Sequence, residues 1–218
     1  MDIAQIKTDL KNTDPQKRMK AVLELRNQDT ETAIPLLKVS MKDKEFLVRS
    51  FTAMTLGKKQ NAESFAALLE MMKFDRDPNV RAEASNSISL FGEIAAPHLT
   101  LAFEQDDHWL VRRSILAAVT ELNCAEELLQ ISSLGIEGED KTVAESSIDC
   151  LGNLANTEKR TQALEKILSL VDHASWRMRW RVAKALGKFK EPEAKEALTK
   201  LKNDENHRVV SAVLESII

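Results

Sequence analysis

Apolar residues return with a helical period in a phrase that recurs along the chain. Counting from the residue before a slot that usually holds arginine, positions zero, four and eight carry mostly apolar side chains. The phrases concerned read Val48, Thr52 and Leu56; Val80, Ala84 and Ile88; and Val111, Ile115 and Val119. Spacing by four places these residues on one face of a helix, so each phrase predicts an amphipathic helix with a buried stripe.

The slot itself occurs seven times. Its occupants are Arg18, Arg49, Arg81, Arg112, Ala144, Arg179 and Arg208, at intervals of 31, 32, 31, 32, 35 and 29 residues. A fixed period near thirty is typical of a solenoid, in which each unit packs only on its neighbours. The absence of tyrosine and the few glycines disfavour strands. We therefore predict an all-α chain, an α-α superhelix of about seven helical pairs, with residues 1–218 as a single repeat domain.

Each repeat reads as two antiparallel helices, the second of which carries the slot. Asp14-Pro15 and Asp77-Pro78 place a carboxylate before a proline, which suits the N-cap and the first turn of a second helix. At the other ends we expect glycines to stop the second helices in a left-handed conformation. These glycines are Gly57, Gly92, Gly152 and Gly187.

The recurrent arginine is predicted to be structural, in preference to a role in ligand binding. Its stem can lie along apolar surface while its guanidinium bonds a capping carboxylate or a carbonyl of the neighbouring repeat. Truncating Arg81 to Ala is therefore expected to lower the melting temperature, which thermal unfolding followed by circular dichroism would measure. An unchanged melting temperature would contradict this ladder of arginines.

Composition narrows the function. Hydrophobic residues make up 43% and charged residues 30% of the chain, and the net charge is -3 with an isoelectric point near 5.9. This acidic balance argues against a dedicated nucleic-acid binder. Cys124 and Cys150 show no metal-ligand spacing, so we predict buried free thiols in a reducing, cytoplasmic setting. No signal peptide or membrane-spanning stretch is predicted.

No catalytic or metal-binding residues are predicted. The sequence has no nucleophile elbow, no phosphate-binding glycine loop and no paired metal motif, and its four histidines are scattered. A DNA glycosylase built from similar helical repeats is a rival interpretation, using Trp109, Trp180 and Asp149. The acidic isoelectric point, together with Glu83 and Glu145 on the same face, opposes DNA binding.

Positions two, three and six of each second helix are predicted to line the concave face. Near the N-terminus these positions form an apolar patch, which soluble proteins usually cover with a partner. The patch consists of Met19, Leu23, Phe51 and Met54, and in the last helix the same positions give Val209, Val210 and Val213. We predict that the patch binds a partner; the alternative is that the curvature of the end repeats buries it.

The segment Trp-Arg-Met-Arg-Trp-Arg at 176–181 has the most unusual composition of any short segment in the chain. Residues 176–202 contain nine basic and three acidic residues, a balance of +6. Aromatic planes beside guanidinium groups could hold a flat anion such as an open-chain tetrapyrrole (a bilin), or an acidic protein surface. The candidate ligand residues are Trp180, Arg181, Arg177 and Arg113, and Trp180 and Lys184 are also candidate partner contacts. The alternative makes Trp176 a core residue and the basic side chains a solvated face.

The fifth repeat departs from the pattern. Ala144 replaces the arginine, and the preceding loop at 135–140 is long and acidic. A missing arginine should loosen the stacking, so we predict a flexible joint between the first four and the last three repeats. Hydrogen exchange is expected to show weakened protection within residues 130–150, and uniform protection there would contradict the joint.

The phrase Asp-Pro-Asn-Val-Arg-Ala-Glu-Ala at 77–84, with its iterations over nearly the whole chain, resembles a HEAT repeat. It is similar to the short bacterial type first associated with cyanobacterial phycobilin lyases. The segment 108–115 resembles the phycobilisome degradation proteins of the non-bleaching B kind. The resemblance implies a HEAT-like solenoid that acts as a non-enzymatic adaptor on a partner protein, a phycobiliprotein during phycobilisome degradation. Its alternative implication is a lyase-like activity that attaches or detaches a bilin.

Overall fold

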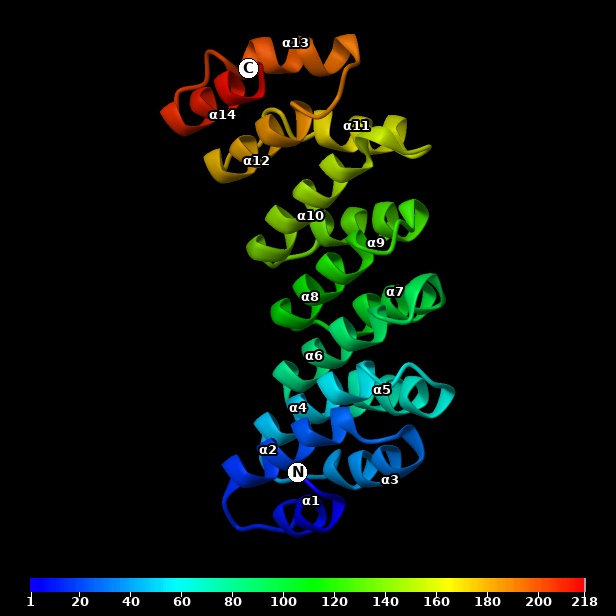
Figure 1. The fold of residues 1–218 in the computed structure, drawn as a ribbon. Coiled ribbons are helices and arrows are strands. Elements are labelled where there is room, and N and C mark those ends of the chain that lie inside the picture. The colour runs from blue at the N-terminus through cyan, green and yellow to red at the C-terminus, as the bar shows by residue number, and fades with distance from the viewer. Residues whose placement is uncertain (218) are drawn as a thin grey trace. The chain divides into compact units, whose positions relative to one another are not determined.

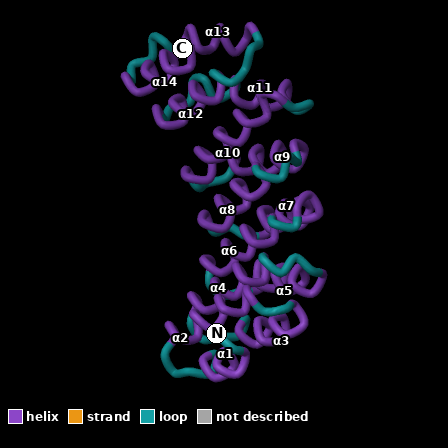
Figure 2. The backbone as a smooth tube through the Cα atoms, in the orientation of Figure 1, coloured by secondary structure: helices purple, strands orange, loops and turns teal. Residues whose placement is uncertain are grey.

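The computed structural model describes residues 1–217, and all of its regular elements there are helices joined by short connections (Figures 1 and 2). The all-α prediction and the seven helical pairs are confirmed. The chain divides into two compact units, Met1–Ala118 and Val119–Ile218. The prediction of one domain over residues 1–218 stays a prediction.

Unit 1 contains the first four pairs. They are α1 (Ile3–Asp9) and α2 (Pro15–Glu24), α3 (Thr30–Ser40) and α4 (Phe46–Gly57), α5 (Ala62–Phe74) and α6 (Pro78–Ser89), and α7 (Ala96–Gln105) and α8 (Trp109–Thr120), with α8 ending two residues into unit 2. Short 3-10 turns cover Leu25–Asn27 and Gly92–Ala95.

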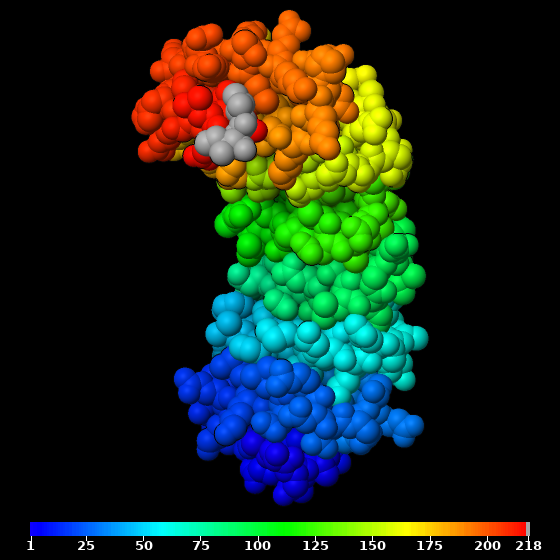
Figure 3. Space-filling view, turned by 45° about the horizontal axis from the view of Figure 1, so that its top comes forward, coloured from blue at the N-terminus to red at the C-terminus, as the bar shows by residue number. Residues whose placement is uncertain are grey.

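Unit 2 contains the other three pairs. They are α9 (Ala125–Glu137) and α10 (Lys141–Asn153), α11 (Arg160–Leu168) and α12 (Trp176–Leu186), and α13 (Pro192–Leu201) and α14 (His207–Ile217), with a 3-10 turn at Leu154–Asn156. In the space-filling view the atoms of α12, α13 and α14 form one continuous surface, coloured from orange to red (Figure 3).

Within each unit, second helices pack against one another and form the core with the first helices. In unit 1, α4 packs between α2 and α6, and in unit 2, α12 packs between α10 and α14 (Figure 1). Every residue of the predicted stripe is fully buried. These are Val48, Thr52, Leu56, Val80, Ala84, Ile88, Val111, Ile115 and Val119. Burial of the apolar stripe is the main favourable contribution to the stability of the stack.

The predicted N-caps are confirmed. The carboxylates of Asp14 and Asp77 accept the backbone N–H groups of Gln16 and Asn79, each at 2.9 Å, and a proline fills the first position of α2 and α6. These bonds satisfy amides that a helix start leaves without a partner.

The predicted left-handed glycines are confirmed at one position only. Gly92 has a φ of 80°, whereas Gly57 and Gly152 lie inside their helices and Gly187 caps α12 with a φ of -60°. A different requirement acts at Gly57, because a Cβ added there would lie 2.9 Å from the Cβ of Ser87 on α6. Close approach of successive second helices, rather than chain reversal, is the reason for glycine there.

The predicted register of the last second helix is wrong by two residues. The slot is the fourth residue of its helix in α2, α4, α6, α8, α10 and α12, and the fourth residue of α14 is Val210, not Arg208. Val209 and Val213 therefore occupy positions zero and four. Both are fully buried, which contradicts their predicted place on the exposed face.

The arginine ladder is confirmed at Arg18, Arg49, Arg81 and Arg179, where the acceptors are aspartates of the next repeat. It is not confirmed at Arg112, whose Nε donates to the carbonyl of Asp106 in its own repeat, and it is wrong at Arg208, which lies against Trp176. Arg49 donates from Nε and Nη2 to the two carboxylate oxygens of Asp75, at 2.7 and 2.9 Å, and only 5% and 7% of these side chains are exposed. The same bidentate pairing joins Arg18 to Asp43, Arg81 to Asp106, and Arg179 to Asp204. Such charge-assisted pairs hold two planar groups in one geometry.

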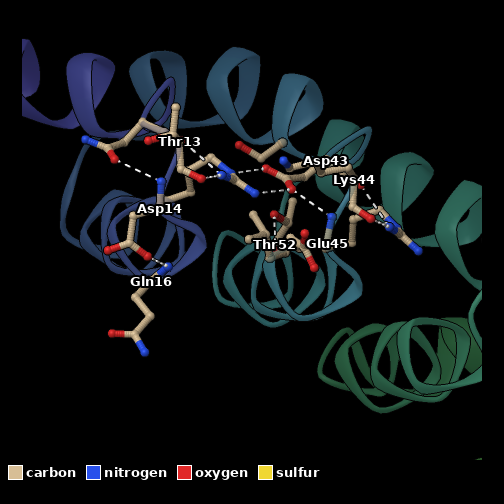
Figure 4. A network of polar contacts seen from close by, with 12 residues as sticks. Thr13, Asp14, Gln16, Asp43, Lys44, Glu45 and Thr52 are labelled. Carbon is tan, nitrogen blue, oxygen red and sulfur yellow. Dashed lines mark hydrogen bonds and ion pairs between the residues drawn. The ribbon is translucent and has the colours of Figure 1, made fainter.

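Each ladder arginine also fastens the loop that precedes its own helix. Nη1 of Arg49 donates to the carbonyls of Asp43 and Lys44, and Nη1 of Arg18 donates to those of Asn12 and Thr13 (Figure 4). Asp43 in turn accepts the N–H of Glu45 while it binds Arg18. One arginine therefore ties together two successive loops, which explains why truncation of Arg81 is expected to lower the melting temperature.

The ladder raises the pKa of its arginines and lowers the pKa of Asp204, one of its acceptors. The hydrogen bond to Asp75 raises the pKa of Arg49 against the effect of burial. The hydrogen bond from Arg179 lowers the pKa of Asp204. Because the folded-state pKa of Asp204 lies below its unfolded value, this carboxylate stabilises the fold above its ordinary pKa, and that contribution is lost as the pH falls through the folded value.

One rung of the ladder is missing in unit 2, because the fifth repeat lacks the donor arginine and the sixth repeat lacks the acceptor aspartate. Ala144 holds the donor slot of α10, and His173 holds the acceptor position six residues before Arg179. Nδ1 of His173 accepts the N–H of Ser175, as the carboxylate of Asp43 does for Glu45. Unit 2 therefore has no carboxylate rung between α10 and the loop before α12. The predicted joint within residues 130–150 stays a prediction.

Candidate functional site

A groove in unit 2 brings together most of the unusual segment at 176–181. It has a volume of about 410 Å³ and lies along α10, α12 and α14, which stack side by side (Figure 1). Its lining residues are Glu145, Trp176, Arg177, Trp180, Arg181, Arg208, Ser211 and Glu215. Volumes of this order are typical of pockets that hold small molecules or anchoring side chains.

Trp176 is the first residue of α12 and lies beside two arginines. The guanidinium carbon of Arg177 is 4.9 Å from the centroid of its ring, and that of Arg208, from α14, is 5.1 Å away. Trp176 is half-buried and lines the groove, so it is not the interior core residue of the alternative interpretation. The position of Arg208 was not predicted, because its register was wrong.

Trp180 carries a second cluster of cations. The guanidinium carbon of Arg181 and Nζ of Lys184 each lie 4.8 Å from its ring centroid. Arg181 also forms ion pairs with two carboxylates of α10, a close one with Asp149 and a longer one with Glu145 at 3.8 Å. Burial raises the pKa of Asp149 despite the opposing effect of Arg181, and the buried Nε of Arg181 has no hydrogen-bond partner among the described residues.

The cations of this site differ in how far they are neutralised. Arg181 is balanced by α10, and Arg179 is balanced within the ladder. For Arg177, Lys184 and Arg208, the described part of the chain offers no carboxylate within ion-pair distance, and all three side chains are exposed. Contacts with indole faces orient a guanidinium without cancelling its charge. The site can therefore attract an anionic ligand or an acidic protein surface.

Arg113, the fourth predicted ligand residue, belongs to α8 in unit 1. Its guanidinium carbon is 5.9 Å from the ring centroid of Trp109, and that ring stacks on His108. Trp109 is 42% exposed. The predicted role of Arg113 beside Trp180 stays a prediction.

The predicted apolar patch of unit 1 is only partly open to solvent. Met19, Leu23 and Phe51 are half-buried, and Met54 is 37% exposed, on the adjacent helices α2 and α4. Packing of α2 against α4 therefore covers part of this patch. Its predicted role as a partner surface stays a prediction.

A second groove, along α5 and α7 in unit 1, was not predicted. It has a volume of about 530 Å³, and its lining includes Phe74 and Leu101, which are 71% and 47% exposed. The candidate surface residues predicted above all lie on second helices, so the outer faces of the first helices were not considered. An aromatic residue at the end of a predicted first helix was the available signal.

The two cysteines differ in burial, and only Cys150 matches the prediction of a buried thiol. Cys124 is half-buried, so the prediction that it is buried is wrong, whereas Cys150 is buried, and burial raises the pKa of its thiol, which disfavours the nucleophilic thiolate. Over the described residues there is no cluster of histidine, cysteine and carboxylate side chains that could hold a metal ion. No described helix is long and apolar enough to span a membrane.

Comparisons with known proteins agree with this fold. The phycocyanin lyase complex of CpcE and CpcF from Nostoc sp. PCC7120 has a TM-score of 0.54 at 17% identity, covering 100% of this chain and 87% of that one. YibA of E. coli has a TM-score of 0.53 at 16% identity, with coverage of 100% and 92%. Human deoxyhypusine hydroxylase has a TM-score of 0.49 at 16% identity, with coverage of 98% and 94%.

At these identities the first two likenesses support the fold alone. A comparison with curated protein sequences finds no match. The model of the family described as HEAT repeats matches residues 4–73, 41–120 and 126–218, which is most of the chain. The chain therefore belongs to the HEAT-repeat family.

Proposed function

We propose that the protein is a non-enzymatic adaptor that binds a partner protein through the exposed faces of its second helices. The observation that carries this proposal is the groove of unit 2, where Arg177 and Arg208 lie on Trp176 without a carboxylate partner among the described residues. Tryptophan and arginine are among the residues most enriched where binding energy is concentrated in protein interfaces. A ladder-braced stack supplies the rigid support that such a surface needs.

The partner we propose is a phycobiliprotein, which the adaptor engages in the cytoplasm of a cyanobacterium during phycobilisome degradation. Two features support this choice: the resemblance of the repeat phrase to the phycobilin-lyase type, and the structural likeness to a phycocyanin lyase complex. Neither cysteine is in a disulfide, which suits a reducing compartment. Docking needs no acid, base or nucleophile.

The alternative is a bilin-handling activity, favoured by the flat indole faces of Trp176 and Trp180 beside Arg177 and Arg181 in the same groove. Guanidinium groups pair well with carboxylates such as the propionates of a bilin. In this version the solenoid would position the pigment while it is attached to or detached from its protein.

Mixing the protein with holo-phycobiliprotein, apo-phycobiliprotein and free bilin tests both proposals. Co-elution in gel filtration with an unchanged bilin absorbance spectrum is expected for an adaptor. A shifted spectrum with free bilin would instead support pigment handling. Neither co-elution nor a shift would reject both proposals.

A further inference from the structure

The N-terminal ends of two neighbouring helices meet at one end of the unit 2 groove. Trp176 is the first residue of α12, and Arg208 is the second residue of α14. The contact between them, 5.1 Å from guanidinium carbon to ring centroid, joins the two ends, and Arg177 lies on the same ring. Two arginines from different repeats therefore share one indole.

This end of the groove is electrically positive. Each helix has eleven residues, and the free amides at a helix start carry partial positive charge. The nearby acids Asp204 and Glu205 are engaged by Arg179, at 2.7 and 3.1 Å, so they are not the partners of the groove arginines. Glu215 lies seven residues beyond Arg208, two turns along α14, and makes the opposite end acidic.

Stacking on the indole prepares these arginines to bind. A guanidinium over an aromatic face keeps its N–H edges free for a carboxylate, and its lost rotamer freedom has already been offset by the stacking. The guanidinium carbons of Arg177 and Arg208 lie 4.9 and 5.1 Å from one ring centroid, so they are at most about 10 Å apart. Side chains two residues apart in an extended segment are about 7 Å apart, which falls within this limit, so one chain can offer a carboxylate to each arginine. A segment with an acidic and a neutral end would also fit the polarity of the groove.

We propose that this end of the groove binds an acidic segment of the partner protein, with carboxylates paired to Arg177 and Arg208 over Trp176. The inference rests on the proposed partner-binding role and specifies its chemistry. It differs from the bilin alternative, in which a pigment would occupy the length of the groove between Trp176 and Trp180.

Intrinsic fluorescence offers a direct test. The chain has three tryptophans and no tyrosine, so a Trp109→Phe variant reports only from Trp176 and Trp180. A short peptide of Glu and Asp residues is expected to change this fluorescence saturably, and its Gln and Asn counterpart is not. The double substitution Arg177→Gln with Arg208→Gln is expected to weaken peptide binding by about tenfold or more.

A matched control removes the same charge elsewhere in unit 2. Lys195 and Lys202 are exposed and do not line the groove, so Lys195→Gln with Lys202→Gln is expected to change peptide affinity by at most about twofold. Circular dichroism and melting temperature verify the fold of both double variants. Equal weakening by the two double variants, or no saturable binding of the acidic peptide, would overturn the inference.

Binding of phycobiliprotein to the same variants separates this inference from the proposed function. If phycobiliprotein binds the parent and the Arg177→Gln, Arg208→Gln variant equally, the acidic-segment site is rejected and the adaptor function stands. If the acidic peptide binds and phycobiliprotein does not, the site stands and that partner is rejected. Self-association abolished by the arginine substitutions would identify a second copy as the occupant and overturn the inference.

Discussion

Replacing Asp75 with Asn is expected to cost about 3 kcal/mol of the free energy of unfolding. The substitution keeps the size of the side chain but removes the negative charge that Arg49 faces, and the Arg49 side chain is only 5% exposed. Its guanidinium would then remain buried beside a neutral amide, with the carbonyls of Asp43 and Lys44 as its other acceptors. The cost arises from an uncompensated buried charge. Urea unfolding monitored by circular dichroism measures it.

An exposed ion pair provides the control. Asp172 pairs with Lys200 at 2.6 Å, and their side chains are 77% and 59% exposed, so Asp172→Asn is expected to cost less than about 1 kcal/mol. Combining Asp75→Asn with Arg49→Met removes both charges of the buried pair and is expected to recover much of the loss. Equal losses from Asp75→Asn and Asp172→Asn would show that the ladder pair contributes no more than a surface contact.

The features predicted correctly from the sequence are those that neighbouring residues determine. The stripe through Val48, Thr52 and Leu56 follows from helical period, and the N-caps at Asp14 and Asp77 follow from the chemistry of a helix start. A period near thirty then places each helix beside its counterpart. That arrangement made the interior role of the arginines predictable, although it did not identify which aspartates receive them.

The predicted register of α14 was wrong because an arginine next to a valine was given more weight than the N-cap residue that sets the start of the helix. Arg208 was assigned to the slot because it is an arginine beside a valine, although this assignment makes the interval from Arg179 29 residues. The helix start is set by Asn206, whose side chain accepts the N–H of Arg208 at 3.0 Å. With Asn206 as the guide, Val210 takes the slot, and the interval from Arg179 becomes regular. Asparagine is a strong N-cap, so the signal was present.

The candidate site was only half predictable for a related reason. Trp176 and Arg177 are adjacent in sequence, so their contact could be expected from the sequence of α12 alone. The contact with Arg208 and the ion pairs of Arg181 to α10 depend on how three helices pack. The packing of the three helices therefore determines which cations are paired with a carboxylate and which are not. The sequence alone showed an excess of positive charge without showing where it was neutralised.

The absent rung of unit 2 leads to the second large effect. Ala144→Arg places a cation at a position that is only 5% exposed and whose corresponding acceptor position, by the register of the repeats, is occupied by His173; it is expected to cost about 3–5 kcal/mol. Adding His173→Asp is expected to recover most of this loss, because a carboxylate there can receive the guanidinium as Asp204 receives that of Arg179. A double-mutant cycle followed by urea unfolding measures the coupling.

The size of the new side chain requires its own control. Ala144→Met has an extended stem without charge, so it separates overpacking from electrostatics, and His173→Asp should leave its effect unchanged. A coupling energy near zero between Ala144→Arg and His173→Asp would mean that α10 and the loop before α12 are not arranged as the other repeats are. A strongly favourable coupling would show that the rung was lost by paired replacement of donor and acceptor. In that case, hydrogen exchange within residues 130–150 is expected to be slower in the doubly substituted protein than in the parent protein.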